Sequence, residues 1–420
     1  MLKEKEKHML ESLRKDADII IKNAIEAALP DSAVKKALEK FPEVKGKIVL
    51  ISVGKAGWQM AYAAYKELGD RIDSGVVVTK YDHSKGQIGN LKIVEAGHPV
   101  PDENSYRGTE EAINAVSNLT SSDMVLFLVS GGGSALFEKP LIPTEDMEKL
   151  TSELLASGAS ITEMNTIRKR MSAVKGGKFA LLCKPARVFS IVLSDIIGDP
   201  LDMIASGPAY PDKSTKEEAV AIAEKYNLSL TPLMKELLAK ETPKSLDNTE
   251  TYVTGSVKEL CKSASKTSEE LGYKPFILTS SLSCIAREAG VFMANIAETY
   301  SSSKESLAFI CGGETVVKLT GKGKGGRNQE FALASAPILS KVENAAIFSV
   351  GSDGTDGPTD AAGGYVDTDT LSTLEKQGID INKVLFDNDA YNALKASGGL
   401  VMTGPTGTNV NDFAVLLLKR

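Results

Sequence analysis

The sequence of residues 124–134 is MVLFLVSGGGS, six apolar residues followed directly by a glycine-rich loop. Two other runs rich in β-branched residues also end in polar loops: Lys47–Val53 leads into GKAG, and Val188–Leu193 leads into SDIIGD. Such runs have no regular polar alternation and are separated by stretches with helical periodicity. This pattern is typical of parallel strands that helices cover on both faces. The sequence therefore predicts an α/β fold built on a parallel sheet.

The same unit repeats through the first half of the chain, and a polar stretch separates it from the second half. Further strands are expected at Gly75–Thr79 and Leu91–Glu95, and helices at Asn104–Leu119, Glu145–Ser157 and Thr162–Ala173. Residues 228–251 turn polar and contain two prolines, so a domain boundary is placed there. We expect an N-terminal domain over residues 1–235 and a C-terminal domain over residues 250–420.

The second half resumes with short apolar runs that predict another sheet. The pair of runs around CGGET (residues 311–315) is interpreted as a hairpin, which makes this sheet mixed rather than parallel. The expected strands are Tyr252–Thr254, Phe276–Thr279, Ala308–Cys311, Val316–Leu319, Ala346–Val350, Leu400–Thr403 and Ala414–Leu418.

Bulk composition narrows the class of protein without identifying it. A chain of 420 residues with 42% hydrophobic and 25% charged residues is expected to be globular, with two or three domains. Its formal net charge of −6 gives no reason to expect nucleic acid or an anionic membrane as partner. The first residues lack a signal-peptide core, apolar runs such as Met124–Val129 are too short to cross a bilayer, and the four cysteines show no CxxC spacing. A cytoplasmic protein with reduced thiols is expected.

The three loops of the first half should face one crevice, because ligands bind outside the carboxyl ends of strands in open α/β sheets. The glycines of Ser130-Gly131-Gly132-Gly133-Ser134 let backbone N–H groups approach an anion at a helix N-terminus. Lys55 can neutralise phosphate charge, and Asp195 and Asp199 can hold a metal ion or accept a proton. Ordinary alternatives are a tight turn, a solvated lysine and helix-capping aspartates. Because the three loops are expected at the same edge of one sheet, a ligand-binding role is favoured over these alternatives for all three loops.

Two further loops in the second half carry similar residue types. Residues 321–328, GKGKGGRN, match GxGxxG in form, but the preceding strand is expected to belong to a hairpin. A flexible basic loop that closes over phosphates fits better, with Arg327 forking onto a carboxylate or phosphate; an exposed hairpin connection is the alternative. Residues 351–360, GSDGTDGPTD, offer aspartates such as Asp353 that can bind hydroxyls or magnesium, or stabilise turns.

Several common active-site classes are excluded because their signatures are missing. The chain has neither the GxxxxGK[ST] spacing of a P-loop nor the HRD and DFG motifs of a protein kinase, and no GxSxG elbow precedes a helix. The aspartates of the 351–360 loop lack EF-hand spacing. His98, in EAGHPVPDEN, is interpreted as a loop-packing residue rather than a catalyst.

Nine strings along the chain resemble, in order, those of the class II glycerate kinases, also called MOFRL-type glycerate 2-kinases. The resemblance covers residues 25–418, and its longest strings are too specific to arise by chance. It implies a Rossmann-like N-terminal domain, a smaller C-terminal α/β domain with a mixed sheet, and an active site in the cleft between them. The strings are VGKAGWQMA, EAGHPVPDENS, LVSGGGSALFE, NTIRKRMSAVKGGKFA, LSDIIGDPLDMIASGPAYPD, GGETVV, GGRNQE, GSDGTDGPTDAAGG and GPTGTNVNDF.

The resemblance also implies transfer of the γ-phosphate of ATP to the 2-hydroxyl of D-glycerate. In that family a lysine of the GKA motif and an aspartate of the SD..GD motif are proposed as the catalytic pair. The matching positions are Lys55 and Asp195, with Asp199 the rival aspartate. We expect Asp195 to accept the hydroxyl proton, Lys55 and Mg²⁺ to stabilise the phosphoryl charge, and Asp199 to be a magnesium ligand. The expected nucleotide- or substrate-binding residues are Gly54, Ser130, Gly131, Gly132, Gly133, Ser134, Arg327 and Asp353.

Two other functions compete with this interpretation. An NAD(P)H-dependent hydroxypyruvate reductase would need a true dinucleotide fingerprint after the first strand, which GKAG is not. A nucleotide-sensing binding module would bind ligand without turnover. The expected partners are glycerate and ATP, with no nucleic acid and no membrane, and the oligomeric state is left open, with a homodimer among the options.

Overall fold

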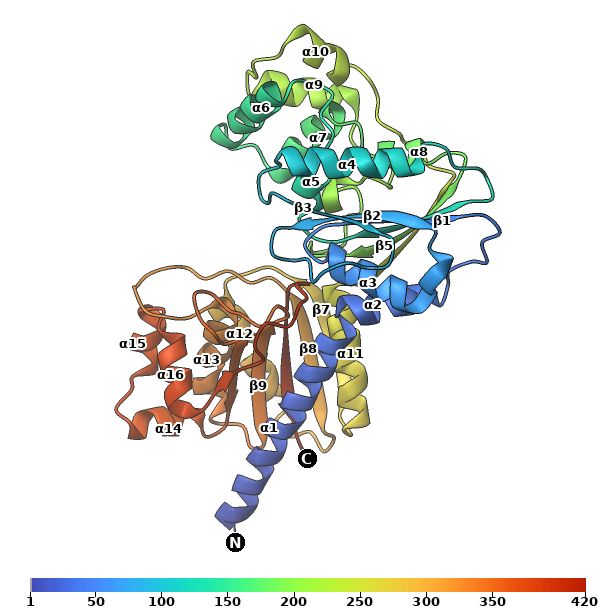
Figure 1. Ribbon diagram of the computed structural model, residues 1–420. Helices are drawn as coiled ribbons and strands as arrows, with labels where there is room; N and C mark the ends of the chain where they lie inside the picture. Colours follow the sequence, from blue (N-terminus) through green and yellow to red (C-terminus); the bar gives the residue numbers. More distant parts are fainter. Residues whose placement is uncertain (1) are drawn as a thin grey trace. The chain divides into compact units, whose positions relative to one another are not determined.

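The computed structural model describes residues 2–420, with side chains from His8 onward, and the chain divides into two compact units (Figure 1). The N-terminal unit comprises Ala33–Ser194 and Asp199–Thr254. The C-terminal unit comprises the chain up to Ser32, Asp195–Gly198 and Gly255–Arg420. Each unit contains one six-stranded sheet.

The sheet of the N-terminal unit has the strand order β3-β2-β1-β4-β5-β6. Strand β1 is parallel to β2 and β4, β3 is parallel to β2, and β5 is parallel to β4. This order is that of the Rossmann fold, in which the chain reverses its direction of winding between β1 and β4. The predicted Rossmann-like sheet is confirmed. Its strands are β1 (Ile48–Val53), β2 (Ser74–Lys80), β3 (Lys92–Ala96), β4 (Met124–Val129), β5 (Arg187–Leu193) and β6 (Thr249–Gly255).

Helices cover both faces of this sheet because its strands are apolar on both sides. Val49 and Ile51 contribute to one core with α4, whereas Ile48 and Leu50 contribute to the other with α3. Helices α6, α7, α9 and α10 pack around a third, separate core (Figure 1). The helices are α2 (Pro30–Leu38), α3 (Gly57–Leu68), α4 (Glu103–Val116), α5 (Gly133–Leu136), α6 (Thr144–Ala156), α7 (Ile161–Met171), α8 (Lys178–Leu182), α9 (Lys216–Lys225) and α10 (Pro232–Leu238).

The sheet of the C-terminal unit has the order β11-β10-β9-β12-β8-β7 and is mixed, as predicted. Strand β12 is antiparallel to β8 and β9, β10 is antiparallel to β9 and β11, and only β7 runs parallel to its neighbour β8. Helices α1 and α11 cover one face and α12–α16 the other (Figure 1). The strands are β7 (Lys274–Leu282), β8 (Leu307–Gly313), β9 (Ala345–Gly351), β10 (Gly363–Asp367), β11 (Leu400–Val401) and β12 (Asp412–Leu418). The helices are α1 (Leu2–Ala27), α11 (Val257–Glu270), α12 (Ala286–Thr299), α13 (Arg327–Leu339), α14 (Thr370–Lys376), α15 (Ile381–Phe386) and α16 (Ala390–Ser397).

The hairpin predicted around Cys311–Thr315 is wrong. Residues 316–319 form no strand, and Val316 makes only an isolated parallel bridge to Ile285. The cause lies at Gly313, whose φ of +155° brings it so close to β7 that a Cβ there would lie 2.1 Å from the Leu282 carbonyl oxygen. The chain therefore leaves β8 beside β7 and does not fold back on itself.

The N-terminal unit differs at both ends from the predicted domain of residues 1–235. It begins at Ala33 and extends to Thr254. Helix α1 packs in the C-terminal unit, where Leu13, Ala17 and Ile20 are fully buried against its sheet. Strand β6, expected in the second sheet, completes the first, with Tyr252 stacked on Phe189 of β5. An amphipathic helix or edge strand shows which face it buries, but not which sheet it covers. No described helix is both long and apolar enough to span a membrane.

Candidate active site

The glycine loops after β1 and β4 lie against each other at the point where the strand order reverses. The main-chain N–H of Lys55 donates to the carbonyl oxygen of Gly131 (2.8 Å), and that of Ala56 donates to the Ser130 hydroxyl (3.1 Å). Gly54 has a φ of +117°, and a Cβ there would lie 2.3 Å from the Ser130 Oγ. Only glycine permits this approach. The two loops occupy the place where open α/β sheets bind ligands.

Two basic side chains, those of Lys55 and His98, meet at this junction. A Cβ built on Gly132 would lie 3.1 Å from the Lys55 Cγ, 3.0 Å from the His98 Cδ2 and 3.1 Å from the His98 Nε2. Both side chains therefore contact the loop at the same residue. The Nδ1–H of His83 donates to the Lys55 carbonyl oxygen (2.9 Å), which ties the Lys55 backbone to the turn after β2. The sequence predicts a loop-packing role for His98, whereas the structure places its side chain beside Lys55.

The far end of the loop rests on a strained turn. The hydroxyls of Ser134 and Ser206 are 3.1 Å apart, and that of Ser206 donates to the Asn165 side-chain oxygen (3.0 Å). Ala205 and Ser206, both buried, adopt φ values of +51° and +60°. Each such residue costs about 1–2 kcal/mol. A Cβ on Gly133 would lie 2.6 Å from that of Ala205, so this turn supports the loop directly.

A buried ion pair supports the loop from below. Lys175 and Glu138 are at most 1% exposed, and their charged groups are 2.7 Å apart. The Lys175 ammonium also donates to the carbonyl oxygens of Ser134 (2.7 Å) and Phe137 (3.2 Å). Burial lowers the pKa of Lys175 to about 8, although Glu138 opposes this shift. The sequence offered one signal for this network, the basic string NTIRKRMSAVKGGK, whose purpose it did not reveal.

The two aspartates of the SDIIGD loop fall into different units. Asp195 belongs with the C-terminal unit, where the Asn411 amide donates to its main-chain carbonyl oxygen (3.3 Å). Asp199 belongs with the N-terminal unit and has a φ of +54°. Both side chains are partly exposed. From the sequence, both residues were predicted to act with Lys55, because no local pattern reveals that the chain changes unit between them.

A magnesium ion would be held here by few protein ligands. Among the described residues, no group of three or more histidine, cysteine, aspartate or glutamate side chains could hold a metal ion. Magnesium bound with a nucleotide uses one or two carboxylates, with phosphates and water as the other ligands. Single carboxylates such as Asp199 and Asp353 fit that role, whereas the residues that the structure describes offer no site made of protein ligands alone.

The C-terminal unit contains a cavity of about 600 Å³ formed by the two glycine-rich loops of its sequence. Arg327, Asp353 and Asp356 all line it. The Asp353 carboxylate accepts the Thr355 N–H (3.0 Å) and so also shapes its own turn. The structure therefore brings the predicted binding residues Arg327 and Asp353 into one cavity, and it adds Asp356, which the sequence pattern does not single out.

The guanidinium of Arg327 is already paired inside its own unit. It donates to both carboxylate oxygens of Asp412 (2.5 and 3.0 Å) and to Glu314 (2.8 Å). Burial opposes the charge, but these carboxylates raise the pKa of Arg327. An incoming phosphate or carboxylate would have to displace one of these two carboxylates from Arg327. Glu314, whose side chain is 46% exposed, is displaced more readily than the buried Asp412.

Asp356 anchors the start of α13. It is 3% exposed and accepts the N–H groups of Asn328 (3.2 Å) and Gln329 (2.9 Å). Gly326 makes this possible, since a Cβ there would lie 2.3 Å from the Asp356 carboxyl carbon. Burial raises the pKa of Asp356 to about 6, and the two backbone hydrogen bonds oppose the shift.

The stability of the chain should therefore depend on pH through Asp356. Because its folded pKa is about 6 and its ordinary value is 3.8, the stabilising contribution of the protonated carboxyl is complete below about pH 4 and is lost as pH rises through 6. Relative to Asp356→Asn, the free energy of unfolding of the wild type should fall by about 3 kcal/mol across this window. Urea unfolding of both proteins from pH 4 to 7 measures this difference, and parallel profiles would contradict it.

The GKGKGG loop is less free than the predicted flexible lid. Backbone hydrogen bonds tie it to residues 387–389: Gly323 donates to the Asp387 carbonyl oxygen (2.7 Å) and Lys324 to the Asp389 carboxylate (2.9 Å). The Lys324 ammonium lies 4.0 Å from the centre of the Tyr391 ring. The lysine side chains are nonetheless exposed, so the charge of the loop faces solvent while its backbone is held.

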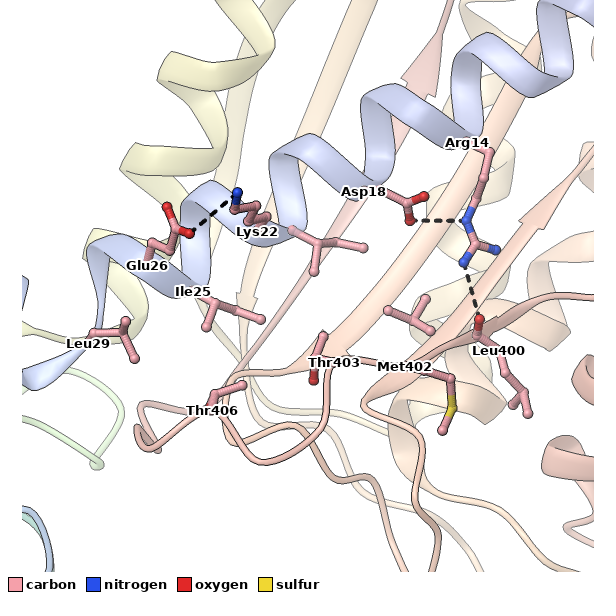
Figure 2. Close-up of a pocket in the computed structure, with 12 residues that line it drawn as sticks. Arg14, Asp18, Lys22, Ile25, Glu26, Leu29, Leu400, Met402, Thr403 and Thr406 are labelled. Carbon is pink, nitrogen blue, oxygen red and sulfur yellow. Dashed lines mark hydrogen bonds and ion pairs between the residues drawn. The ribbon is translucent and has the colours of Figure 1, made fainter. Parts of the chain in front are cut away.

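A second pocket of the C-terminal unit lies between α1 and residues 400–406 (Figure 2). Its volume is about 530 Å³. Its charged residues are already paired, Arg14 with Asp18 (3.0 Å) and Lys22 with Glu26 (3.8 Å), and Arg14 also donates to the Leu400 carbonyl oxygen. None of the predicted site residues lines it, and the hydrogen bond from Arg14 to Leu400 ties α1 to the sheet at its edge.

Comparison with known proteins gives full-length matches. Residues 16–239 match a family described as a domain of unknown function (DUF4147), and residues 307–412 match the MOFRL family. A protein of Thermotoga maritima named D-glycerate 2-kinase is 51% identical over 97% of this chain and 99% of its own. A crystal structure of a glycerate kinase from the same organism superimposes with a TM-score of 0.93 and covers 97% of this chain and 100% of the other.

A different name also occurs among the relatives. A protein of Agrobacterium vitis with the provisional name hydroxypyruvate reductase is 38% identical, over 94% of this chain and 92% of its own. Its identity is lower than that of the Thermotoga protein, at similar coverage.

Proposed function

The chain belongs to the class II, MOFRL-type glycerate kinase family, and on that premise we propose that it transfers the γ-phosphate of ATP to the 2-hydroxyl of D-glycerate, giving 2-phosphoglycerate and ADP. The observation that carries this proposal is the 51% identity to a D-glycerate 2-kinase along nearly the whole of both chains. The arrangement of Lys55 and the Ser130–Ser134 loop supports it, because a lysine and a glycine loop at this point of a Rossmann-type sheet suit an anionic substrate.

In this mechanism each predicted residue has one task. Asp195 accepts the proton of the 2-hydroxyl, whose pKa lies far above neutrality, as the new bond forms. Lys55 stabilises the charge on the transferring phosphoryl group. Gly54 and the Ser130–Ser134 loop hold phosphate or the substrate carboxylate. In the C-terminal unit, Arg327 and Asp353 bind a phosphate, carboxylate or hydroxyl group in the cavity that they line. Magnesium, with Asp199 as a ligand, would supply neutralisation of the phosphate charge.

The reductase alternative is not supported, because neither glycine loop that could bind a dinucleotide has the required structural context. The strand that opens the Rossmann-type sheet, β1, ends in GKAG and not in a dinucleotide fingerprint. The one GxGxxG-like string, residues 321–328, lies after an irregular stretch and leads into α13 of the other unit. A dinucleotide fingerprint requires a strand immediately before it and a βαβ unit around it.

The test is a pair of assays on the purified protein. One couples ADP formation from D-glycerate and MgATP to NADH oxidation, and the phosphorylated product is identified by ³¹P NMR. The other supplies hydroxypyruvate with NADH or NADPH and no nucleotide triphosphate. We expect ADP and 2-phosphoglycerate in the first and no turnover in the second. Reduction of hydroxypyruvate without kinase activity, or ligand binding without turnover in either assay, would overturn the proposal.

The homodimer and the cytoplasmic location remain predictions from the sequence. Light scattering coupled to size-exclusion chromatography measures the assembly state in solution, and cell fractionation measures the location.

A further inference from the structure

We propose that His98 is an anion-binding residue, which acts with Lys55 to hold a negatively charged oxygen group of a substrate over the Ser130–Ser134 loop. The inference rests on the proposed kinase function and deepens it, because it names a residue to which that proposal gives no task. The anionic group is either the carboxylate of the acceptor or a phosphoryl group of the donor, which share the same recognition chemistry.

The geometry places the imidazole where the loop can present an anion to it. His98 follows the chain out of β3, and Lys55 follows β1, so two separate strand ends deliver these side chains to one glycine. The Cβ position of Gly132 lies within 3.1 Å of both the His98 Nε2 and the Lys55 Cγ. A side chain at residue 132 would fill the space where they converge. The reactive nitrogen of His98 thus lies beside the predicted catalytic lysine.

The His98 ring is not committed to another partner. Among the residues that the structure describes, none forms a hydrogen bond with it, and the side chain is partly exposed. The Nδ1–H of His83, by contrast, donates a hydrogen bond to the Lys55 carbonyl oxygen. A ring that served only to pack a loop would be expected to bury itself or to bond the nearby backbone.

The charges around His98 are those of an anion site. Burial and the positive charges of Lys55, Lys80 and His83 lower the pKa of His98. Asp102, four residues further along the chain, is engaged elsewhere: it accepts the Tyr81 hydroxyl (2.7 Å) and the Ser105 N–H in the first turn of α4 (3.0 Å). Without ligand, His98 is therefore neutral at neutral pH. An oxyanion would offset the surrounding charge, raise the pKa of His98 and draw a proton onto the ring.

The chain provides a direct measurement of this effect, since it contains only three histidines, His8, His83 and His98. The ¹³Cε1 and ¹Hε1 resonances of each are followed from pH 5 to 9, with assignment from single His→Gln variants. Titrations are run on the protein alone, with sulfate as a phosphoryl mimic, and with D-glycerate. Neither ligand titrates in this range, so a shifted histidine pKa reports on the protein.

We expect the pKa of His98 to rise by at least one unit with one of these ligands, while that of exposed His8 stays constant. A shift with sulfate alone assigns the phosphoryl group, and a shift with D-glycerate alone assigns the carboxylate. Equal behaviour of all three histidines, or no shift of His98 at saturating sulfate and D-glycerate, would overturn the inference. The NMR titration needs no turnover. Its failure can therefore be distinguished from failure of the kinase assay.

Variants provide a second, independent measurement. His98→Gln keeps one hydrogen-bond donor near the Nε2 position but cannot become charged, whereas His98→Ala removes the group. For His98→Ala we expect at least a tenfold weaker affinity for the ligand that shifts the wild-type pKa, and for His98→Gln partial recovery. Binding to wild type should weaken as pH rises between the free and bound pKa values of His98, and this dependence should vanish in His98→Gln. An unchanged affinity and pH dependence in both variants would contradict the role.

Discussion

Replacing Lys55 by alanine is expected to lower the turnover number by about a hundredfold to a thousandfold and to leave the fold intact. The loss follows from removing a positive charge that acts mainly on the transition state, where the phosphoryl group is most in need of it. The fold should persist because the main-chain bonds of Lys55 to Gly131 and His83 do not involve its side chain. Steady-state kinetics with MgATP and D-glycerate measure the effect.

A suitable control is Lys85→Ala. Lys85 is an exposed lysine in the same unit, hydrogen-bonded to Gln59, and its removal changes the net charge equally. It should retain near wild-type turnover. If folded Lys55→Ala turns over at the rate of this control, Lys55 has no part in the chemistry. A change confined to KM would instead assign Lys55 to binding substrate and transition state equally.

Asparagine at position 195 is expected to lower turnover by about a hundredfold or more at any magnesium concentration. General-base catalysis contributes about 10²–10⁴-fold, and an asparagine cannot accept the hydroxyl proton. The bond from Asn411 to the main chain of residue 195 should survive. Kinetics at several magnesium concentrations separate this outcome from a metal effect.

The companion variant, Asp199→Asn, is expected to raise the magnesium concentration required for half-maximal turnover while approaching normal rates at saturation. Asparagine tolerates the left-handed backbone of residue 199, whose φ is +54°, so the substitution should not disturb the loop. Asp247→Asn, in a surface residue 79% exposed, provides the control for loss of a carboxylate. The opposite pattern in the two variants would mean that Asp195 binds the metal and Asp199 is the base.

The first sheet was predictable because its information is local. The central parallel strands β1, β4 and β5 are short, mainly apolar runs, and β4 was predicted to the residue at Met124–Val129. Strands β1 and β5 were predicted within one residue at each end. Val316–Leu319 had the same apolar character but forms no strand, because its hydrogen-bonding partner would have to be β8, and Gly313 directs the chain away. Apolar character predicts burial, but a strand also needs an available neighbour.

The candidate site could be proposed from the sequence for a similar reason. A glycine-rich loop can be recognised from its own sequence as a possible anion-binding loop. Lys55, Ser130–Ser134 and Arg327 could therefore all be singled out. His98 could not, since a lone histidine before a proline carries no spacing signal. Asp356 is one of three aspartates in one loop, and only its burial against the start of α13 distinguishes it.

Local sequence patterns were thus enough to predict the α/β class and the strand-end loops, and to propose the residue types of the candidate site. Three features depended on contacts between distant segments: helix α1 covers the C-terminal sheet, Asp195 and Asp199 belong to different units, and His98 lies beside Lys55. Local patterns arise from hydrophobic periodicity and turn chemistry, which a few neighbouring residues settle. The same amphipathic helix could bury its apolar stripe on either sheet, with a similar gain in hydrophobic free energy per unit area. Which sheet it covers is therefore decided by the packing of the whole chain.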